Sequence, residues 1–148
     1  MLRGNHTARI DSKGRLKVPT PFRRYVEEKH GSGLYITSLT GECARVYPLP
    51  EWEAVEQRLL LLPSMDPTRR KFLDITNYYG QESSMDNQGR VLIHPKLRKS
   101  AGIIGEVEVE VLGYLNYIEV WEQEKFQHHL ASNPFTAEDE ATLARLGI

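Results

Sequence analysis

Residues 6–19, HTARIDSKGRLKVP, recur in altered form as residues 81–94, QESSMDNQGRVLIH, at an offset of 75. Apolar positions match between the two stretches, because Leu16 and Val18 correspond to Val91 and Ile93. The polar positions that are identical form the pattern Asp-x-x-Gly-Arg in each stretch. These residues are Asp11, Gly14 and Arg15 in the first copy and Asp86, Gly89 and Arg90 in the second. The chain is therefore predicted to contain two copies of one structural unit.

Each copy is predicted to begin with a strand, a tight turn and a second strand. Gly14 and Gly89 suit the turn because glycine adopts positive φ readily, and the Asp three residues earlier can hydrogen-bond the turn backbone. After the first turn, outward Arg15 and Lys17 alternate with apolar residues over residues 15–18. This period of two is typical of a strand with one buried face.

A short helix is expected to follow each second strand. Prolines at positions 19 and 21 favour a helix over residues 22–29, and Pro95 favours a shorter one in the second copy. The Glu/Val alternation of residues 106–112 predicts a strand with the valines inside. The remaining predicted strands are residues 34–39, 43–47 and 117–121, and the remaining predicted helices are residues 51–62, 68–79, 122–130 and 136–146.

One copy is too small to bury a substantial hydrophobic core, whereas two copies could interleave their hairpins. We therefore expect one closed β-barrel with pseudo-twofold symmetry and peripheral helices. The predicted organisation is a first half at residues 1–62, a linker helix at 63–78, a second half at 79–131 and a helical tail at 132–148.

Charge is distributed unevenly along this 148-residue chain, although its formal net charge is only −1. Residues 1–24 hold seven basic residues and one acidic residue, a net charge of +6. Residues 106–148 hold nine acidic and two basic residues, a net charge of −7. A local basic stripe attracts phosphate whatever the total charge. The acidic segment is expected to face away from any nucleic acid.

Several classes of protein are disfavoured by the sequence. The longest apolar run, residues 59–62, is far shorter than a membrane span, and the N-terminus lacks the apolar region of a secretory signal. Cys43 is the only cysteine, so a disulfide framework is excluded. Together these features favour a cytoplasmic protein.

An enzyme is not expected either. No nucleophile elbow, P-loop or dinucleotide-binding motif is present. His128 and His129 are adjacent, so on a helix they point about 100° apart, which does not suit one metal ion. We therefore predict no catalytic residues, no metal site, no cofactor and no small-molecule substrate.

The repeated arginine has two possible roles. Arg15 and Arg90 could each pair with the Asp of the same turn and stabilise the loop. Alternatively, a rigid turn could present each arginine outward, and arginine suits bidentate contact with phosphate or guanine. The positions that match Arg9, Lys13 and Lys17 are uncharged in the second copy, so the first site is expected to bind phosphate more strongly.

The stretches MLRGNHTARIDSKGRLKVPTPFRR (1–24) and SMDNQGRVLIHPKLRKSAGI (84–103) resemble the two halves of the MraZ family of bacterial transcriptional regulators. These halves are similar to DNA-binding domains of the AbrB/SpoVT type. The resemblance implies a mainly β fold with peripheral α-helices, in which an internal tandem repeat forms a double-split, swapped-hairpin β-barrel. It also implies homo-oligomeric rings. His94 departs from the pattern, because the usual proline stands one residue later, at Pro95.

The resemblance further implies sequence-specific binding of double-stranded DNA at promoter direct repeats upstream of the division and cell-wall gene cluster. Such a regulator would work in the cytoplasm, in association with the nucleoid. The family motif falls on Arg15 and Arg90, and the AbrB-like basic pair falls on Arg23 and Arg24, with Arg98 and Lys99 as counterparts. The full set of predicted DNA-binding residues is Arg3, Arg9, Lys13, Arg15, Arg23, Arg24, Arg90, Arg98 and Lys99.

Two other functions compete with this prediction. The antidote of a toxin–antitoxin pair can share the same barrel, but such antidotes carry one copy and a disordered tail that wraps the toxin. In this chain a second copy replaces that tail. A purely structural ring is the other alternative, and it would leave the repeated arginine without a role.

Overall fold

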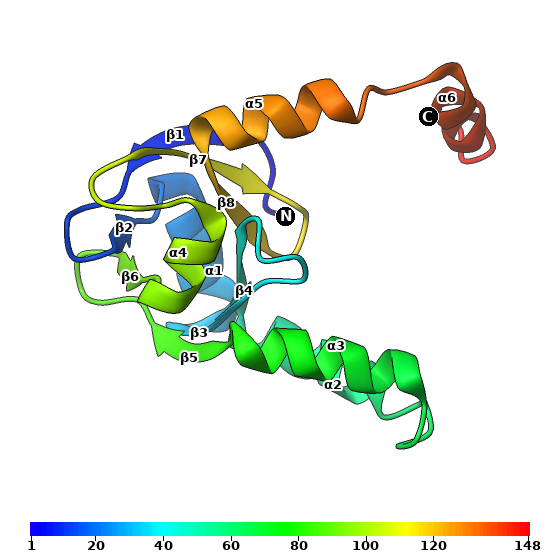
Figure 1. Cartoon of the computed structure of the whole chain (residues 1–148), viewed down its shortest axis with the longest axis horizontal. Helices are drawn as coiled ribbons and strands as arrows, with labels where there is room; N and C mark the ends of the chain where they lie inside the picture. The colour runs from blue at the N-terminus through cyan, green and yellow to red at the C-terminus, as the bar shows by residue number, and fades with distance from the viewer.

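The computed structural model describes all residues from 1 to 148 as eight strands and six helices. Figure 1 shows a β-rich body from which two helical arms extend in the same general direction. The first copy contains β1 (Asn5–Arg9), β2 (Arg15–Lys17), α1 (Thr20–His30), β3 (Gly33–Thr37), β4 (Ala44–Pro48) and α2 (Leu49–Leu59), and α3 (Pro67–Tyr78) follows. The rest contains β5 (Gln81–Ser84), β6 (Arg90–Leu92), α4 (Pro95–Ala101), β7 (Glu108–Gly113), β8 (Ile118–Glu122), α5 (Gln123–Ser132) and α6 (Ala137–Ala144).

The strands of the two copies alternate in space rather than forming separate sheets. Each strand of the first copy pairs antiparallel with one of the second: β1 with β7, β2 with β6, β3 with β5 and β4 with β8. Within a copy, only β3–β4 and β7–β8 pair. Most backbone hydrogen bonds of the first copy's strands therefore depend on the second copy.

The mainly β architecture with peripheral helices is confirmed, but the prediction of a closed barrel was wrong. Six strands form an open sheet in the order β1-β7-β8-β4-β3-β5, and β2 and β6 form a separate two-stranded sheet. An isolated bridge between Ile10 and Leu16 is the link between β1 and β2. The ladder does not continue beyond this bridge because the adjacent backbone groups have other partners: Ile10 N–H donates to the Val107 carbonyl, and Val18 N–H donates to the Gly89 carbonyl.

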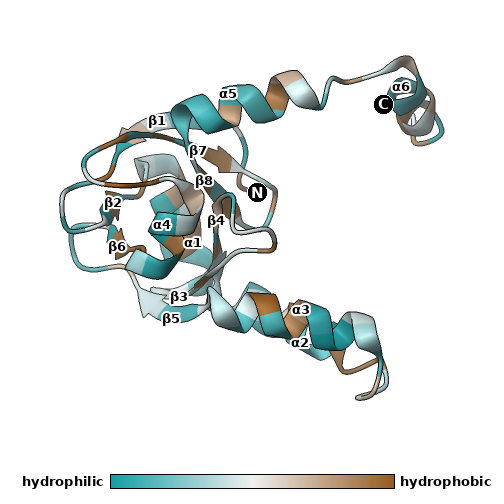
Figure 2. Ribbon diagram, viewed as in Figure 1, coloured by the Kyte–Doolittle hydropathy of each residue, from teal (hydrophilic) through white to brown (hydrophobic).

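The hydrophobic core is built from equivalent positions of both copies. Leu16 and Val91 are buried beneath the two-stranded sheet, and Phe22 of α1 and Leu97 of α4 fill matching places. These residues belong to one cluster of 20 buried side chains. Figure 2 shows the polar outer positions of the body in teal and the apolar segments within it in brown. The core is therefore shared, as the matching apolar pattern predicts.

Two helices, α3 and α6, begin after the predicted capping residues, whereas α1 and α2 each begin two residues earlier than predicted. The C-terminal ends are shifted by one to three residues. Asp66 accepts hydrogen bonds from two backbone N–H groups at the start of α3, and Thr136 and Asp139 form the predicted capping box of α6. The helix predicted over residues 51–62 ends three residues earlier than predicted, at Leu59 of α2. Leu62 is consequently exposed rather than packed.

The surroundings of the acidic strand β7 differ from those predicted. Val109 and Val111 are buried as expected, but Glu110 between them is also buried, 8% exposed. Its carboxylate accepts hydrogen bonds from Thr7 of β1 and Gln123 of α5. Because α5 packs on the outer face of β7, both faces of this strand are covered there. Alternation alone cannot predict such a covering helix.

Candidate nucleic-acid interface

The two Asp-x-x-Gly-Arg turns have the same hydrogen-bonded structure. In the first turn, one carboxylate oxygen of Asp11 accepts from the backbone N–H groups of Lys13 and Arg15, each at 2.9 Å. In the second, Asp86 accepts from Gln88 and Arg90 at the same distances. Gly14 and Gly89 have φ of 81° and 75°, a region that strains other residues. The predicted roles of the Asp and Gly residues as turn-forming residues fit this geometry.

Both turns meet at the two-stranded sheet of β2 and β6, which we call the ribbon. In its register Arg15 lies opposite Leu92, and Lys17 lies opposite Arg90. These four side chains point outward, because Leu16 and Val91 between them are buried. Figure 1 shows the ribbon and its turns at the edge of the body remote from α3 and α6. The ribbon is thus an outward face with three basic side chains.

The structure combines the two possible roles of the repeated arginine. Arg15 Nε donates to a carboxylate oxygen of Asp11 at 2.8 Å, and Arg90 Nε donates to Asp86 at 2.9 Å. Neither arginine donates a hydrogen bond within the chain from its terminal guanidinium nitrogens, and about a third of each side chain is exposed, 34% and 31%. Each guanidinium is therefore oriented by the turn while its outer nitrogens face solvent.

The turn carboxylates carry a charge that the fold itself stabilises. The backbone N–H of Arg15 lowers the pKa of Asp11 below its ordinary value of 3.8, with further contributions from the Arg15 side chain and the N–H of Lys13. The N–H of Arg90 lowers the pKa of Asp86 in the same way. Both carboxylates are ionised near neutral pH, so the two Arg–Asp pairs persist there.

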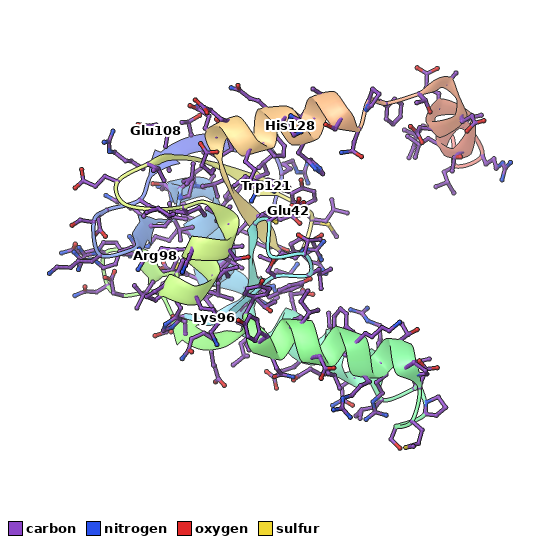
Figure 3. The ribbon with its side chains drawn as sticks, in the orientation of Figure 1. Glu42, Lys96, Arg98, Glu108, Trp121 and His128 are labelled. Carbon is purple, nitrogen blue, oxygen red and sulfur yellow. The ribbon has the colours of Figure 1, made fainter.

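Arg23 and Arg98 lie against the turn of the opposite copy. Arg23 of α1 donates from Nη2 to the carbonyl of Asn87 at 3.0 Å, and from Nε to Glu27 at 2.8 Å. Arg98 of α4 donates from Nε to the carbonyl of Ile93 at 2.7 Å. In Figure 3 Arg98 is labelled on the side of α4 next to the ribbon. Parts of both guanidinium groups are therefore occupied within the chain.

Three further predicted residues are exposed. Lys13 is at the tip of the first turn, and Arg24 and Lys99 each follow the arginine that packs on the opposite turn. None of the three donates a side-chain hydrogen bond or forms an ion pair within the chain. Their charges are therefore available to an external anion.

Two predicted residues have different surroundings. Arg9 forms an ion pair with Glu108 at 3.2 Å and approaches Glu106 at 3.9 Å, because β1 pairs directly with β7. The acidic strand therefore lies directly beside one residue of the basic segment, and Figure 3 shows Glu108 beside β1. Arg3 is beyond the other end of β1, where Leu2 bridges to Leu115. At about 3.3 Å per residue this is roughly 20 Å from Arg9.

One residue outside the predicted site belongs to the ribbon face. Lys17 is exposed and faces Arg90 across the ribbon, although it is distant from that residue in sequence. Leu92, which occupies the equivalent place in the second copy, lies opposite Arg15. Through this register Lys17 is a neighbour of Arg90, whereas a comparison of sequence positions alone counts it as a neighbour of Arg15. Strand alternation predicted that Lys17 points outward, but not what it faces.

Other kinds of site are not evident. No three His, Cys, Asp or Glu residues gather in a way that could hold a metal ion. No helix is long and apolar enough to cross a membrane. The basic ribbon with its two arginine-bearing turns is the most distinctive polar feature of the surface.

The fold and the ribbon together define a class of tandem-repeat β-protein in which two interleaved copies present arginine from one face. A family model described as "MraZ protein, putative antitoxin-like" matches residues 1–75 and 80–146. The chain therefore belongs to the MraZ family.

Curated relatives agree with this membership over the full chain. The "Transcriptional regulator MraZ" of Acidobacterium capsulatum is 51% identical over 148 residues and covers 100% of both chains. The protein of the same name from Koribacter versatilis is 52% identical, again over 100% of both chains. That of Escherichia coli O9:H4 is 38% identical over 96% of this chain and 92% of its own. These relatives are named as regulators of transcription, not as enzymes, which confirms the prediction of a non-enzyme.

Proposed function

We propose that this protein is a sequence-specific, DNA-binding regulator of transcription that acts on short direct repeats upstream of the division and cell-wall gene cluster. The observation that carries the proposal is the outward ribbon, with Arg15 and Arg90 oriented by their turns and Lys17 opposite Arg90. Family membership supports the regulatory part, and the family resemblance supports the choice of operator. Such a protein would act at the nucleoid, in the cytoplasm.

The size of the ribbon suits the major groove of DNA. A two-stranded β-ribbon fits that groove, and arginine there can donate two hydrogen bonds to guanine. Arg15 and Arg90 are diagonal neighbours in the register, so their Cα atoms are about 7–8 Å apart. This spacing corresponds to roughly two base-pair steps of about 3.4 Å. Both arginines of one chain would therefore contact a single operator repeat.

Contacts with phosphate would come from the cations around the ribbon. Lys13, Arg24 and Lys99 are exposed and unpaired, so they could neutralise the backbone on either side of the groove. Arg9 is expected to contribute less, because Glu108 partly neutralises it. Arg3 would reach DNA only if the duplex extended well beyond the ribbon.

Direct repeats require one ribbon per repeat, which favours a homo-oligomer, and we propose a ring. The connection between α2 and α3 exposes apolar side chains, including Leu61 at 83% and Met65 at 90%. It appears in Figure 2 as the brown tip of the lower arm. Apolar residues at the end of a projecting arm favour packing against a second copy. Light scattering should report a multiple of 17.0 kDa, and a monomer alone would contradict this part of the proposal.

The antidote hypothesis is less consistent with the strand pairing. An antidote of that type uses one copy for DNA and a disordered tail for its toxin. In this chain the second copy supplies strand partners to all four strands of the first. The second copy is therefore needed for the fold and does not act as a separate binding tail.

Titration of the protein with DNA from upstream of its own gene tests the proposed function. We expect tight binding that is lost when the repeats are scrambled at constant base composition. If about five cations on this face neutralise phosphates, log K should fall with log salt with a slope of roughly −4 to −5. Equal affinity for scrambled DNA, or a flat salt response, would count against the proposal.

A further inference from the structure

The arginines of α1 and α4 are placed crosswise with respect to the two turns. By the offset of the repeat, Arg23 and Arg98 occupy equivalent positions, as do Gly14 and Gly89. A Cβ atom added to Gly14 would collide with the guanidinium of Arg98. A Cβ atom added to Gly89 would lie 2.6 Å from Cδ of Arg23. Each turn glycine therefore leaves space for an arginine that comes from the other copy.

The hydrogen bonds cross directly between the copies at the second turn, whereas at the first turn they pass through Ile93. Gly14 accepts at its carbonyl from the N–H of Ile93, and the carbonyl of Ile93 in turn accepts from Arg98 Nε. At the other turn, Gly89 accepts from the N–H of Val18, while Arg23 donates directly to the Asn87 carbonyl. The first turn is thus connected to α4 and the second turn to α1.

We propose that Arg23 and Arg98 are positioning residues that hold the turn of the opposite copy, so that Arg98 orients Arg15 and Arg23 orients Arg90. This inference rests on the proposed function, because the turns are taken as the DNA-reading elements. The next residues in each helix, Arg24 and Lys99, form no such contact and remain the phosphate ligands of the basic pair.

The crosswise arrangement has a consequence for recognition. Arg15 and Arg90 both contact one repeat. The turn of Arg15 is supported by α4 of the second copy, and the turn of Arg90 is supported by α1 of the first copy. A disturbance of either half would therefore change the presentation of both arginines. Arg23 and Arg98 are therefore needed for DNA recognition because of their contacts with the turns, and not because of their charge alone.

Hydrogen exchange of the full-length protein without DNA tests the positioning directly. Arg98→Ala removes the guanidinium that packs on Gly14 and the bond to Ile93, whose N–H donates to Gly14. It should speed exchange of the Lys13, Gly14 and Arg15 amides by about five- to tenfold and leave residues 88–90 unchanged. Arg23→Ala should give the opposite pattern. Arg24→Ala and Lys99→Ala, which remove the same charge from the same helices, should change neither turn. Faster exchange in the turn of the same copy, or in both turns equally, would overturn the proposal.

DNA binding gives a second, independent readout. A lost phosphate contact reduces the salt slope by about one, whereas a lost positioning contact weakens binding without changing that slope. We expect the first behaviour for Arg24→Ala and Lys99→Ala, and the second for Arg23→Ala and Arg98→Ala. A reduced slope for Arg23→Ala or Arg98→Ala would show a phosphate contact instead.

Conservative substitution separates geometry from charge. Arg98→Lys keeps the positive charge but removes the Nε–H that reaches Ile93. It should behave like Arg98→Ala in both measurements, and restoration of wild-type behaviour would overturn the positioning role. If the wild-type protein bound no DNA, the proposed function would fail, while hydrogen exchange would still decide the crosswise support.

Discussion

Arg15→Ala is expected to abolish most sequence-specific DNA binding while the protein remains folded. Arg15 is the outward arginine of the first turn, and its terminal nitrogens have no partner within the chain. Loss of one bidentate contact to a base costs about 1–3 kcal/mol, or roughly 5- to 150-fold in affinity at a single ribbon. In an oligomer that binds several repeats together, the losses at each repeat multiply.

Gel-shift titration at fixed salt measures this effect, with Arg70→Ala as the matched control. Arg70 is on α3, away from the ribbon, and its exposed pair with Asp74 contributes little to stability. Both variants lose one positive charge, so a difference between them reports position and not net charge. Unchanged affinity of Arg15→Ala would remove the ribbon from the proposed interface. Thermal unfolding close to that of the wild type would show that the fold is retained.

Arg90→Ala is a useful companion to the same experiment. Counting basic neighbours along the sequence predicts a smaller effect than for Arg15→Ala, because Ser84, Gln88 and Leu92 replace the cations of the first copy. The register changes this expectation, since Lys17 lies directly opposite Arg90. We therefore expect the losses of DNA affinity in the two variants to differ less than the sequence alone suggests. Lys13 is then the one basic neighbour that still favours the first turn.

Division of the chain between α2 and α3 should have an equally large effect, in this case on folding. A fragment of residues 1–62 retains β3–β4 as its only strand pair, because β1 and β2 and the outer edges of β3 and β4 pair with strands of the second copy. Apolar residues such as Leu16 and Phe22 would lose much of the core that buries them. We expect this fragment not to fold as a monomer.

Circular dichroism and light scattering of the separate and mixed fragments test this prediction. Fragments 1–62 and 63–148 should each lack cooperative unfolding as monomers, and mixing them should restore a folded complex. A homodimer of one fragment would be consistent with the interleaving, because a second copy could donate the missing strands. A folded monomer of residues 1–62 would contradict it.

Local features of this fold could be predicted from the sequence because they depend on neighbouring residues. The turns follow from Asp and Gly at fixed spacing, and capping by Asp66 and Thr136 is determined within one helical turn. The apolar alternation that matches between the copies correctly predicted a shared core with Leu16 and Val91 inside.

Long-range features could not be predicted, because they depend on which strands become neighbours. The Arg9–Glu108 pair and the Lys17–Arg90 pairing exist only through the registers of β1–β7 and β2–β6. The crosswise contacts of Arg23 and Arg98 depend on how α1 and α4 pack over the ribbon. The closed barrel was predicted wrongly, because beyond the Ile10–Leu16 bridge β1 pairs with β7 and β2 pairs with β6.

The most direct test of the central claim is a nuclease footprint of the wild-type protein on the DNA upstream of its own gene. If the ribbon binds promoter repeats, short protected segments should appear at each direct repeat, and Arg15→Ala at the same concentration should lose them while Arg70→Ala keeps them. Absence of protection by the wild-type protein, or the same footprint with Arg15→Ala, would contradict the claim that this ribbon recognises operator DNA.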